Sequence, residues 1–315
     1  FDRPAAVRAW LGRLQPRALV LLELEIWPQL LLACRQRGIP VYLINARCSA
    51  RSYAGYRQLG ALLQPAFAAI DGVLAQNALW AARLKHLGAR GVSAGGSLKA
   101  DLVQPSRPDQ QQQLAQRLGI NRQQPVLLIA STSAGEELPF IHAWPQLRHI
   151  LSHWQLIIVP RHPERGNDLA ADIRQQGMNC WQSSQQTNPS DEANMVWLID
   201  EIGVLGAAYG LADMAVVGGS LGSKRGSQNM LEAVAHHCAT IVGPDTRNFP
   251  DAMTLLLEGG GIIQVPDQQA AIAVIKRLSQ DPTERHRLGD RGYHLWQQAR
   301  GAVAALDHWL ITQGR

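Results

Sequence analysis

Short apolar runs alternate with segments of helical periodicity along almost the whole chain. Near the start, residues 18–24 and 41–45 are apolar runs of strand length. The segment 27–37 between them opens with Pro28 and is followed by Gly38. Proline at the first helical position and glycine just past the last one are typical helix boundaries. A helix between two buried strands predicts a βαβ unit, and therefore a parallel sheet.

The alternation continues and is interrupted once. A helix over 52–69, a strand over 72–76 and a helix over 77–87 complete the first part. Residues 104–113 contain two prolines and four consecutive glutamines, which is typical of a linker. Beyond it, the pattern predicts strands at 126–130, 156–160, 196–199, 215–218, 240–242 and 262–265, and helices that include 203–211, 228–237 and 268–279.

This pattern predicts an α/β protein with two Rossmann-like domains, residues 1–104 and 105–315. The 315 residues are enough for two separate cores. In open α/β sheets, ligands bind beyond the carboxyl ends of the strands. Polar residues that directly follow a predicted strand are therefore the candidates for a functional site.

Composition narrows the class of protein. An apolar content of 46% excludes a disordered chain, and apolar runs are too short for a membrane span. The four cysteines have spacings that fit neither a zinc site nor a disulfide framework, which favours a reducing compartment. Residues 1–104 carry 13 Lys and Arg against 5 Asp and Glu, whereas residues 105–315 carry 17 against 20. A basic first part indicates an anionic partner or, alternatively, an arginine-rich solvated surface.

Three polar clusters in the first part follow strands: one after each of the runs at 18–24 and 41–45, and one after a further strand that ends before Gly95. Glu23 and Glu25 stand where a strand meets a helix, and strand alternation places them on the same side. They cap the helix or serve a function, and the cost of burying Glu23 favours a function for at least one of them. The segment 45–52 is either a functional cluster or a loop leading into a serine-capped helix. The segment Gly95–Lys99 resembles an anion cradle that presents one lysine.

The second part offers further clusters. Arg161 and His162 end a strand between two prolines, which make the backbone rigid. Residues 217–220 (Val-Gly-Gly-Ser) close another strand. Residues 226–229 then open a helix whose amino end is suited to phosphate. Glu232 in this helix is placed to accept both hydroxyls of a ribose.

Other candidates have simpler interpretations. Glu136 and Glu137 are interpreted as charges at a helix amino terminus. His236 and His237 are adjacent in sequence and do not face one metal, so we assign them to a helix end. Neither a dinucleotide fingerprint nor a P-loop is present. The nine tryptophans are scattered along predicted helices and indicate core packing, so no nucleic-acid partner is expected.

Taken together, seven motifs in the same order resemble the 3-deoxy-manno-octulosonate (Kdo) transferases of lipopolysaccharide synthesis. They cover nearly the whole chain. The motifs are ELEIWP at 23–28, NARCSARS at 45–52, GSLK at 96–99, PRHPER at 160–165, VGGS at 217–220, QNMLE at 228–232 and GPDTRNF at 243–249.

The resemblance implies a GT-B architecture, in which two Rossmann-like domains with parallel sheets face each other across a cleft. It implies a glycosyltransferase that moves Kdo from CMP-Kdo to the lipid A precursor, tetraacyldisaccharide 1,4′-bisphosphate. The implied place is the cytoplasmic face of the inner membrane, with an anionic membrane surface as a further partner. No metal and no cofactor are implied, because CMP-Kdo is the donor substrate.

The resemblance also assigns residues. Glu23 and Lys99 correspond to groups that stabilise the transition state, and Glu25 is a further catalytic candidate. On the acceptor side, Asn45, Arg47 and Ser49 are expected to bind substrate. On the donor side, the expected substrate-binding residues are Arg161, His162, Gly203, Val204, Leu205, Gly219, Ser220, Asn229, Met230, Leu231 and Glu232.

The chain departs from the family pattern in two respects. Gln228 stands where many members have histidine. Family members also carry a membrane anchor and a catalytic glutamate, the general base, before the point where this sequence begins. We therefore expect an amino-terminally truncated chain that binds CMP without transferring Kdo, with the helices at about 283–313 packing back on the first domain. The alternative is a non-catalytic or different GT-B protein that binds a nucleotide sugar.

Overall fold

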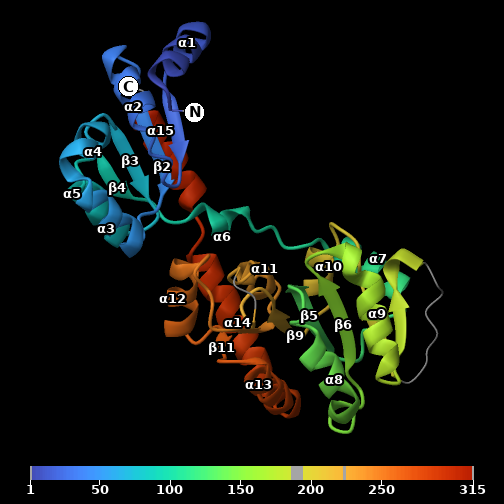
Figure 1. The fold of residues 1–315 in the computed structure, drawn as a ribbon. Helices are drawn as coiled ribbons and strands as arrows, with labels where there is room; N and C mark the ends of the chain where they lie inside the picture. The colour runs from blue at the N-terminus through green and yellow to red at the C-terminus, as the bar shows by residue number, and fades with distance from the viewer. Residues whose placement is uncertain (1, 186–193, 223–224, 314–315) are drawn as a thin grey trace. The chain divides into compact units, whose positions relative to one another are not determined.

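The computed structural model describes residues 2–185, 194–222 and 225–313, which form two compact units (Figure 1). The first unit contains residues 1–102 together with 299–315, and the second contains residues 103–298. The boundary lies two residues before the position expected from the sequence. Each unit has its own parallel sheet and its own hydrophobic core. An α/β fold is therefore confirmed for both.

The first unit is built on a four-stranded sheet in the order β1-β2-β3-β4. The strands are β1 (Leu19–Leu22), β2 (Val41–Ala46), β3 (Gly72–Ala75) and β4 (Val92–Ala94), and all neighbouring pairs are parallel. The helices are α1 (Pro4–Leu14), α2 (Pro28–Gln36), α3 (Ala50–Gln58), α4 (Gly60–Phe67), α5 (Ala78–His86) and α6 (Leu98–Leu102).

Two predictions for this unit were wrong in detail. The single helix expected over 52–69 is two helices, α3 and α4, which meet at Leu59. Gly60 follows the break, and glycine lowers the helix propensity at that point. The strand expected over 18–24 ends at Leu22, because Glu23 adopts a left-handed backbone with φ of 59°. Strand alternation therefore does not extend to Glu23 and Glu25.

The last helix, α15 (Ala302–Gln313), belongs to the first unit and appears in Figure 1 as a red helix among blue and cyan elements. The ring of Trp309 packs edge-on against Tyr42 of β2, with centroids 5.6 Å apart. The carboxylate of Asp101 accepts hydrogen bonds from the backbone N–H groups of Gly301 and Val303, at 2.8 and 2.7 Å. The return to the first unit thus begins at 299, later than the 283 expected from sequence.

The second unit is built on a seven-stranded parallel sheet in the order β11-β10-β9-β5-β6-β8-β7. Its strands are β5 (Val126–Thr132), β6 (Gln155–Pro160), β7 (Asn179–Gln182), β8 (Met195–Leu198), β9 (Met214–Val217), β10 (Ala239–Val242) and β11 (Ile263–Gln264). Its α-helices are α7 (Pro108–Leu118), α8 (Leu138–Leu147), α9 (Gly166–Gln175), α10 (Leu205–Tyr209), α11 (Met230–Val234), α12 (Pro250–Glu258), α13 (Gln268–Gln280) and α14 (Pro282–Gln298).

Three differences from the sequence expectation matter here. Strand β7 was not predicted, because its sequence Asn-Cys-Trp-Gln has no apolar run and lies at the sheet edge. The helices expected over 203–211 and 228–237 are the five-residue helices α10 and α11. Gly203, Gln228 and Asn229 therefore lie in the loops before these helices.

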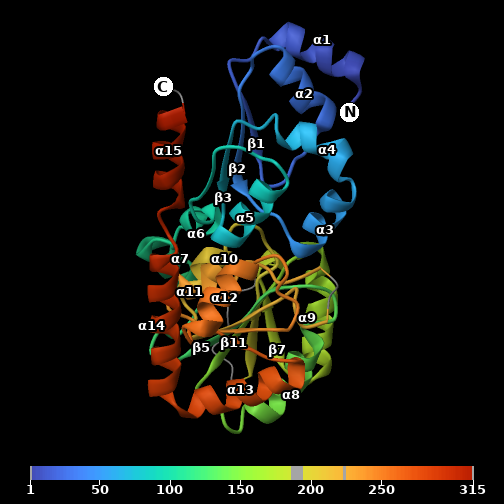
Figure 2. The same cartoon turned by 90° about the vertical axis from the view of Figure 1, so that its left-hand side faces the viewer.

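Helix α14 packs closely against the end of α11 and the start of β10, and Figure 2 shows it running beside α11 and α12. The contact requires glycine, because a Cβ atom at Gly289 would lie 2.0 Å from the carbonyl oxygen of His237. Across the part of the chain that the structure describes, no helix is both long enough and apolar enough to cross a membrane.

Candidate functional site

In the first unit, two of the sequence motifs meet at the carboxyl ends of β1 and β2. The backbone N–H of Glu23 donates to the carbonyl of Ile44 at 3.1 Å, and that of Arg47 donates to the carbonyl of Glu23 at 3.3 Å. The side chains then form an ion pair, with 3.1 Å between Arg47 Nε and Glu23 Oε2. Both side chains are about two-fifths exposed, so the pair remains accessible to solvent.

Asn45 joins the third motif to this cluster. It is buried and has a left-handed backbone, with φ of 49°. Its side-chain oxygen accepts a hydrogen bond from the backbone N–H of Leu98 at 3.2 Å. Lys99, the next residue, is half-buried, and its N–H lies 3.4 Å from the hydroxyl of Ser97. Residues from three motifs that are distant in the sequence therefore lie at one edge of the sheet.

Glu25 and Ser49 are placed differently. The carboxylate of Glu25 is exposed and accepts a hydrogen bond from the indole N–H of Trp27 at 3.0 Å. The prediction that Glu25 shares a side of the strand with Glu23 was wrong, since β1 ends before both residues. The hydroxyl of Ser49 caps α3 by accepting from the backbone N–H of Ser52 at 3.1 Å. Ser49 thus fits the helix-cap alternative.

In the second unit, a buried carboxylate joins the loops that follow β5 and β9. Glu136 is 1% exposed. It accepts hydrogen bonds from the backbone N–H groups of Ser133 at 2.8 Å, Gly219 at 2.7 Å and Leu221 at 2.8 Å. The interpretation of Glu136 as a helix-terminal charge was therefore wrong. Its carboxylate fixes the backbone on both sides of Ser220.

The neighbouring Glu137 is fully buried in a second arrangement. The guanidinium of Arg165 binds its two carboxylate oxygens at 2.7 and 2.9 Å, and the hydroxyl of Thr132 donates to it at 2.7 Å. Hydrogen bonding to Glu137 raises the pKa of Arg165. A charge buried this deeply requires such partners. The pair holds the PRHPER segment against the end of β5.

Gly219 and Ser220 form a tight loop after β9. Gly219 has φ of 85°, and a Cβ atom there would lie 2.5 Å from the carbonyl oxygen of Gly226. Glycine is therefore required on two counts, backbone conformation and space. The hydroxyl of Ser220 accepts from the N–H of Gly243 at 2.8 Å, which joins the loop to the motif that follows β10.

Glu232 lies in the first turn of α11 and is partly buried. The side-chain amide of Asn229 donates to its carboxylate at 3.1 Å, while the amide oxygen of Asn229 accepts from the N–H of Leu231 at 3.2 Å. Burial raises the pKa of Glu232, although the hydrogen bond from Asn229 and the positive charge of Arg161 oppose the rise. Arg161 directly follows β6, and its positive charge therefore acts on the carboxylate of Glu232 in α11.

The remaining predicted donor-side residues fall into two groups. Met230 and Leu231 are buried in the core, so they present only backbone groups to a ligand. His162 lies 3.3 Å from the carboxylate of Glu164 and 3.2 Å from the guanidinium of Arg225. Gly203 and Val204 line a cleft of about 700 Å³ together with the start of α7, and Leu205 begins α10 beside it.

Nothing in the sequence indicated that His236 joins the segment before α7 to α11. The backbone N–H of Ser106 donates to Nε2 of His236 at 2.9 Å, and Nδ1 of His236 lies 2.7 Å from the carbonyl oxygen of Glu232. Nε2 therefore accepts and Nδ1 donates, as in a neutral imidazole. Burial lowers the pKa of His236. Within the described residues, no three metal-binding side chains gather as a metal site would require.

Comparison with known proteins agrees with this arrangement. The sequence model of a family described as 3-deoxy-D-manno-octulosonic-acid transferase (kdotransferase) matches residues 1–102. A 3-deoxy-D-manno-octulosonic acid transferase from Bordetella pertussis is 34% identical over 98% of this chain and 73% of the relative. One from Haemophilus influenzae is 30% identical over 97% of this chain and 72% of the relative.

Solved structures agree with the similarity to Kdo transferases. The crystal structure of the C-terminal CMP-Kdo binding domain of WaaA from Acinetobacter baumannii is 27% identical, with a TM-score of 0.54. It matches 60% of this chain and 97% of that domain. Anabaena HepE in complex with UDP has a TM-score of 0.60 over 99% of this chain and 81% of HepE; at 13% identity it shows the GT-B fold alone. With one-third identity over nearly its whole length, the chain belongs to the 3-deoxy-D-manno-octulosonic acid transferase family.

Proposed function

We propose that this protein acts in the transfer of Kdo from CMP-Kdo to the lipid A precursor, tetraacyldisaccharide 1,4′-bisphosphate, in the synthesis of the lipopolysaccharide core, and that residues 1–315 by themselves bind CMP without completing the transfer. The main support is the 27% identity to a CMP-Kdo binding domain across 60% of the chain. In the second unit, most of the residues that the sequence assigned to the donor follow the carboxyl ends of β6 and β9, and the charge of Arg161 acts on Glu232. Ligands of open α/β sheets bind at that edge.

On the donor side, each group has a proposed role. The carboxylate of Glu232 accepts hydrogen bonds from the ribose hydroxyls of CMP, and the amide of Asn229 holds that carboxylate in place. Arg161 supplies positive charge and hydrogen-bond donors to the phosphate, and His162 contacts CMP beside it. The loop at Gly219 and Ser220, fixed by Glu136, approaches the ligand through its backbone.

On the acceptor side, Lys99 offsets negative charge on the departing CMP phosphate or on the Kdo carboxylate, and Glu23 stabilises the transition state. Arg47 orients Glu23 through their ion pair. The reaction inverts the sugar centre and uses neither metal nor cofactor. A general base takes the proton from the acceptor hydroxyl as the bond to CMP breaks.

The basic residues of the first 104 positions are proposed to contact the bisphosphorylated acceptor and the anionic cytoplasmic face of the inner membrane. Each lysine or arginine close to such a surface contributes about 1 kcal/mol to binding. Binding of the chain to anionic vesicles should weaken as salt rises, because salt screens exposed charges. Salt-independent binding, or no binding, would contradict this part of the proposal.

Two assays on the 315-residue chain test the proposed reaction. In the first, CMP and UDP compete for the donor site, and CMP should bind more tightly; a preference for UDP would contradict the proposed donor. In the second, transfer from CMP-Kdo to the tetraacylated precursor is measured. Turnover in this assay, abolished in Glu25→Gln, would assign the general base to Glu25. CMP binding without turnover would be consistent with a base outside these residues.

A further inference from the structure

A chain of hydrogen bonds inside the second unit passes through the side chain of His236. This residue directly follows Ala235, the C-terminal cap of α11. In a continuing α-helix, the backbone N–H of residue 236 would donate to the carbonyl of Glu232. That N–H donates to Ala233 at 3.1 Å instead, and the imidazole Nδ1 lies 2.7 Å from the carbonyl oxygen of Glu232. The side chain of His236 therefore caps the main chain of Glu232.

The other edge of the ring is bound to the segment before α7. Nε2 of His236 accepts from the backbone N–H of Ser106 at 2.9 Å, and the hydroxyl oxygen of Ser106 lies 2.9 Å from the same nitrogen. That hydroxyl donates to the carbonyl of Gly206 in α10 at 3.0 Å. Ser106, Val204 and Gly206 line the same cleft of about 700 Å³. The chain of bonds thus connects α10, beside this cleft, with α11.

Packing keeps the imidazole in this orientation. The ring of Tyr209 in α10 stacks on it, with centroids 6.2 Å apart and ring planes inclined by 25°. Tyr209 is itself 1% exposed, so the imidazole packs against a fixed wall. Burial lowers the pKa of His236, which keeps the imidazole neutral, the form in which one ring nitrogen accepts and the other donates.

The position of the Glu232 carboxylate depends on this link. Helix α11 has only five residues, and so short a helix has little stability of its own, so contacts outside the helix hold it in place. Asn229 binds the side chain of Glu232 at 3.1 Å, and His236 binds its main chain. Hydrogen bonds weaken steeply once their geometry departs from the ideal. A shift of this main chain would therefore weaken any bond that the carboxylate makes to a ligand.

We propose that His236 is a positioning residue for the donor nucleotide, which holds the carboxylate of Glu232 where the ribose hydroxyls can reach it. This inference rests on the proposed function, because it deepens the role assigned to Glu232 in binding CMP. His236 acts through the carbonyl of Glu232 and through Ser106, which ties α11 to Gly206 at the wall of the cleft. It thereby couples two segments that the sequence assigned to the donor, residues 203–205 and 229–232.

Calorimetric titration of the 315-residue chain with CMP and with 2′-deoxy-CMP tests this role. The two nucleotides differ only in the 2′-hydroxyl, so the ratio of their dissociation constants measures the ribose contact. The wild type should bind CMP about tenfold more tightly than 2′-deoxy-CMP, because the latter cannot donate a 2′-hydroxyl to the carboxylate. Glu232→Ala should reduce this ratio to about one.

His236→Phe keeps an aromatic ring against Tyr209 but removes both hydrogen bonds of the imidazole. This variant should weaken CMP binding about fivefold and lower the ratio from about ten to about two. His236→Gln, whose amide carries both a donor and an acceptor, should restore a ratio close to that of the wild type. A merely structural role would weaken the binding of both nucleotides equally and leave the ratio unchanged. That result, or unchanged CMP affinity in His236→Phe, would overturn the inference.

Ser106→Ala keeps the inference testable if His236→Phe does not fold. It is a smaller change that retains the N–H bonded to His236 and removes only the hydroxyl bonded to Gly206. The ratio should fall about twofold, because α11 then loses part of its link to the cleft. An unchanged ratio in Ser106→Ala would in that case overturn the inference.

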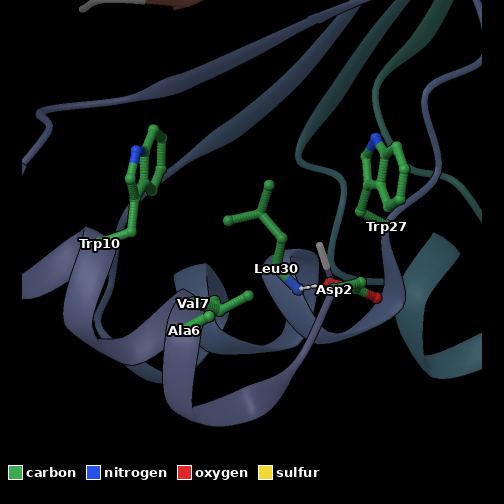
Figure 3. Close-up of a pocket in the computed structure, with 6 residues that line it drawn as sticks. All are labelled: Asp2, Ala6, Val7, Trp10, Trp27 and Leu30. Carbon is green, nitrogen blue, oxygen red and sulfur yellow. Dashed lines mark hydrogen bonds between the residues drawn. The ribbon is translucent and has the colours of Figure 1, made fainter.

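The matched control is Asp2→Ala in the first unit. Figure 3 shows Asp2 beside Leu30, whose backbone N–H donates to the Asp2 carboxylate at 2.9 Å. Like His236→Phe, this variant removes a side chain that binds the main chain at the end of a helix. Both affinities and their ratio should equal those of the wild type. A changed ratio here would show that the ratio follows stability instead of the donor site, and would overturn the inference.

The same titrations separate the positioning role from the proposed function. A Glu232→Ala chain with the wild-type ratio would contradict the ribose contact of the proposed function, and the positioning role with it. A Glu232→Ala chain with a ratio near one, beside a His236→Phe chain with the wild-type ratio, would overturn the positioning role alone.

Discussion

The two units hold their candidate site residues in different ways. In the first unit, Glu23 and Arg47 pair where both side chains remain about two-fifths exposed. In the second unit, Glu136 and Glu137 are 1% and 0% exposed, and each is held by several hydrogen bonds. Exposed pairs contribute little to stability, whereas breaking a buried network leaves groups that water can no longer reach. The network around Glu136 and Glu137 is thus rigidly held, whereas the pair of Glu23 and Arg47 can still adjust.

The sheets explain this difference. Every residue of β5 and β6 is buried, so the loops at their carboxyl ends start from fixed positions. In β1 the burial alternates, and Val20 and Leu22 are about half exposed.

The largest effect is expected for Glu136→Ala in the second unit. The substitution leaves three buried N–H groups without their acceptor, so the free energy of unfolding should fall by about 3 kcal/mol. CMP affinity should fall as well, because Gly219 loses its fixed position. Urea unfolding and CMP titration measure the two effects.

The control for this variant is Glu258→Ala at the exposed end of α12. Its stability should change by no more than about 0.5 kcal/mol. A Glu136→Ala chain as stable as this control would remove the distinction between the two units.

The next effect concerns the ligand directly. Glu232→Ala should weaken CMP binding by about 1–3 kcal/mol, the range for hydrogen bonds to a charged group. The folded variant is compared with Glu258→Ala by calorimetry, with thermal unfolding as the check on structure. Unchanged CMP affinity would mean that Glu232 only stabilises α11.

A pH dependence distinguishes the second unit further. Burial lowers the pKa of His236 from its ordinary value of 6.5, so the unfolded chain takes up a proton before the folded chain does. Stability should therefore fall as the pH drops below 6.5, by at most about 1.4 kcal/mol per pH unit from this group. His236→Gln should reduce this slope when urea unfolding is measured between pH 7.5 and 5.5. An identical slope in the variant would show that groups other than His236 cause the loss of stability at low pH.

The smallest effect is expected in the first unit. A double-mutant cycle on Glu23→Gln and Arg47→Gln should give a coupling energy of about 0.2–1 kcal/mol in unfolding experiments, because the pair is exposed. The coupling should decrease as salt is added. A coupling above 2 kcal/mol would show that the pair is as strongly held as the network around Glu136.

The sequence alone was sufficient for most of the fold. Buried parallel strands are continuous apolar runs, and proline and glycine mark the helix ends, so β2, β5, β6 and α13 lie close to where periodicity placed them. The predictions that failed depend on signals that periodicity does not contain. Strand β7 is short and polar, and the left-handed residue at Glu23 ended β1 inside an apolar run.

The site also has a part that the sequence predicted and a part that only the structure revealed. The motifs that follow strands identified Glu23, Arg47 and Asn45 as candidates, and the structure brings them to one edge of the sheet because parallel strands end there. Only the tertiary structure showed that Glu136 accepts hydrogen bonds from Gly219 and Leu221, which lie 83 and 85 positions later in the chain. It also decided that α15 returns to the first unit and that Ser106 contacts His236, 130 residues away. Local pattern determines where strands and helices form, but a buried polar group finds its partners only when distant segments pack together.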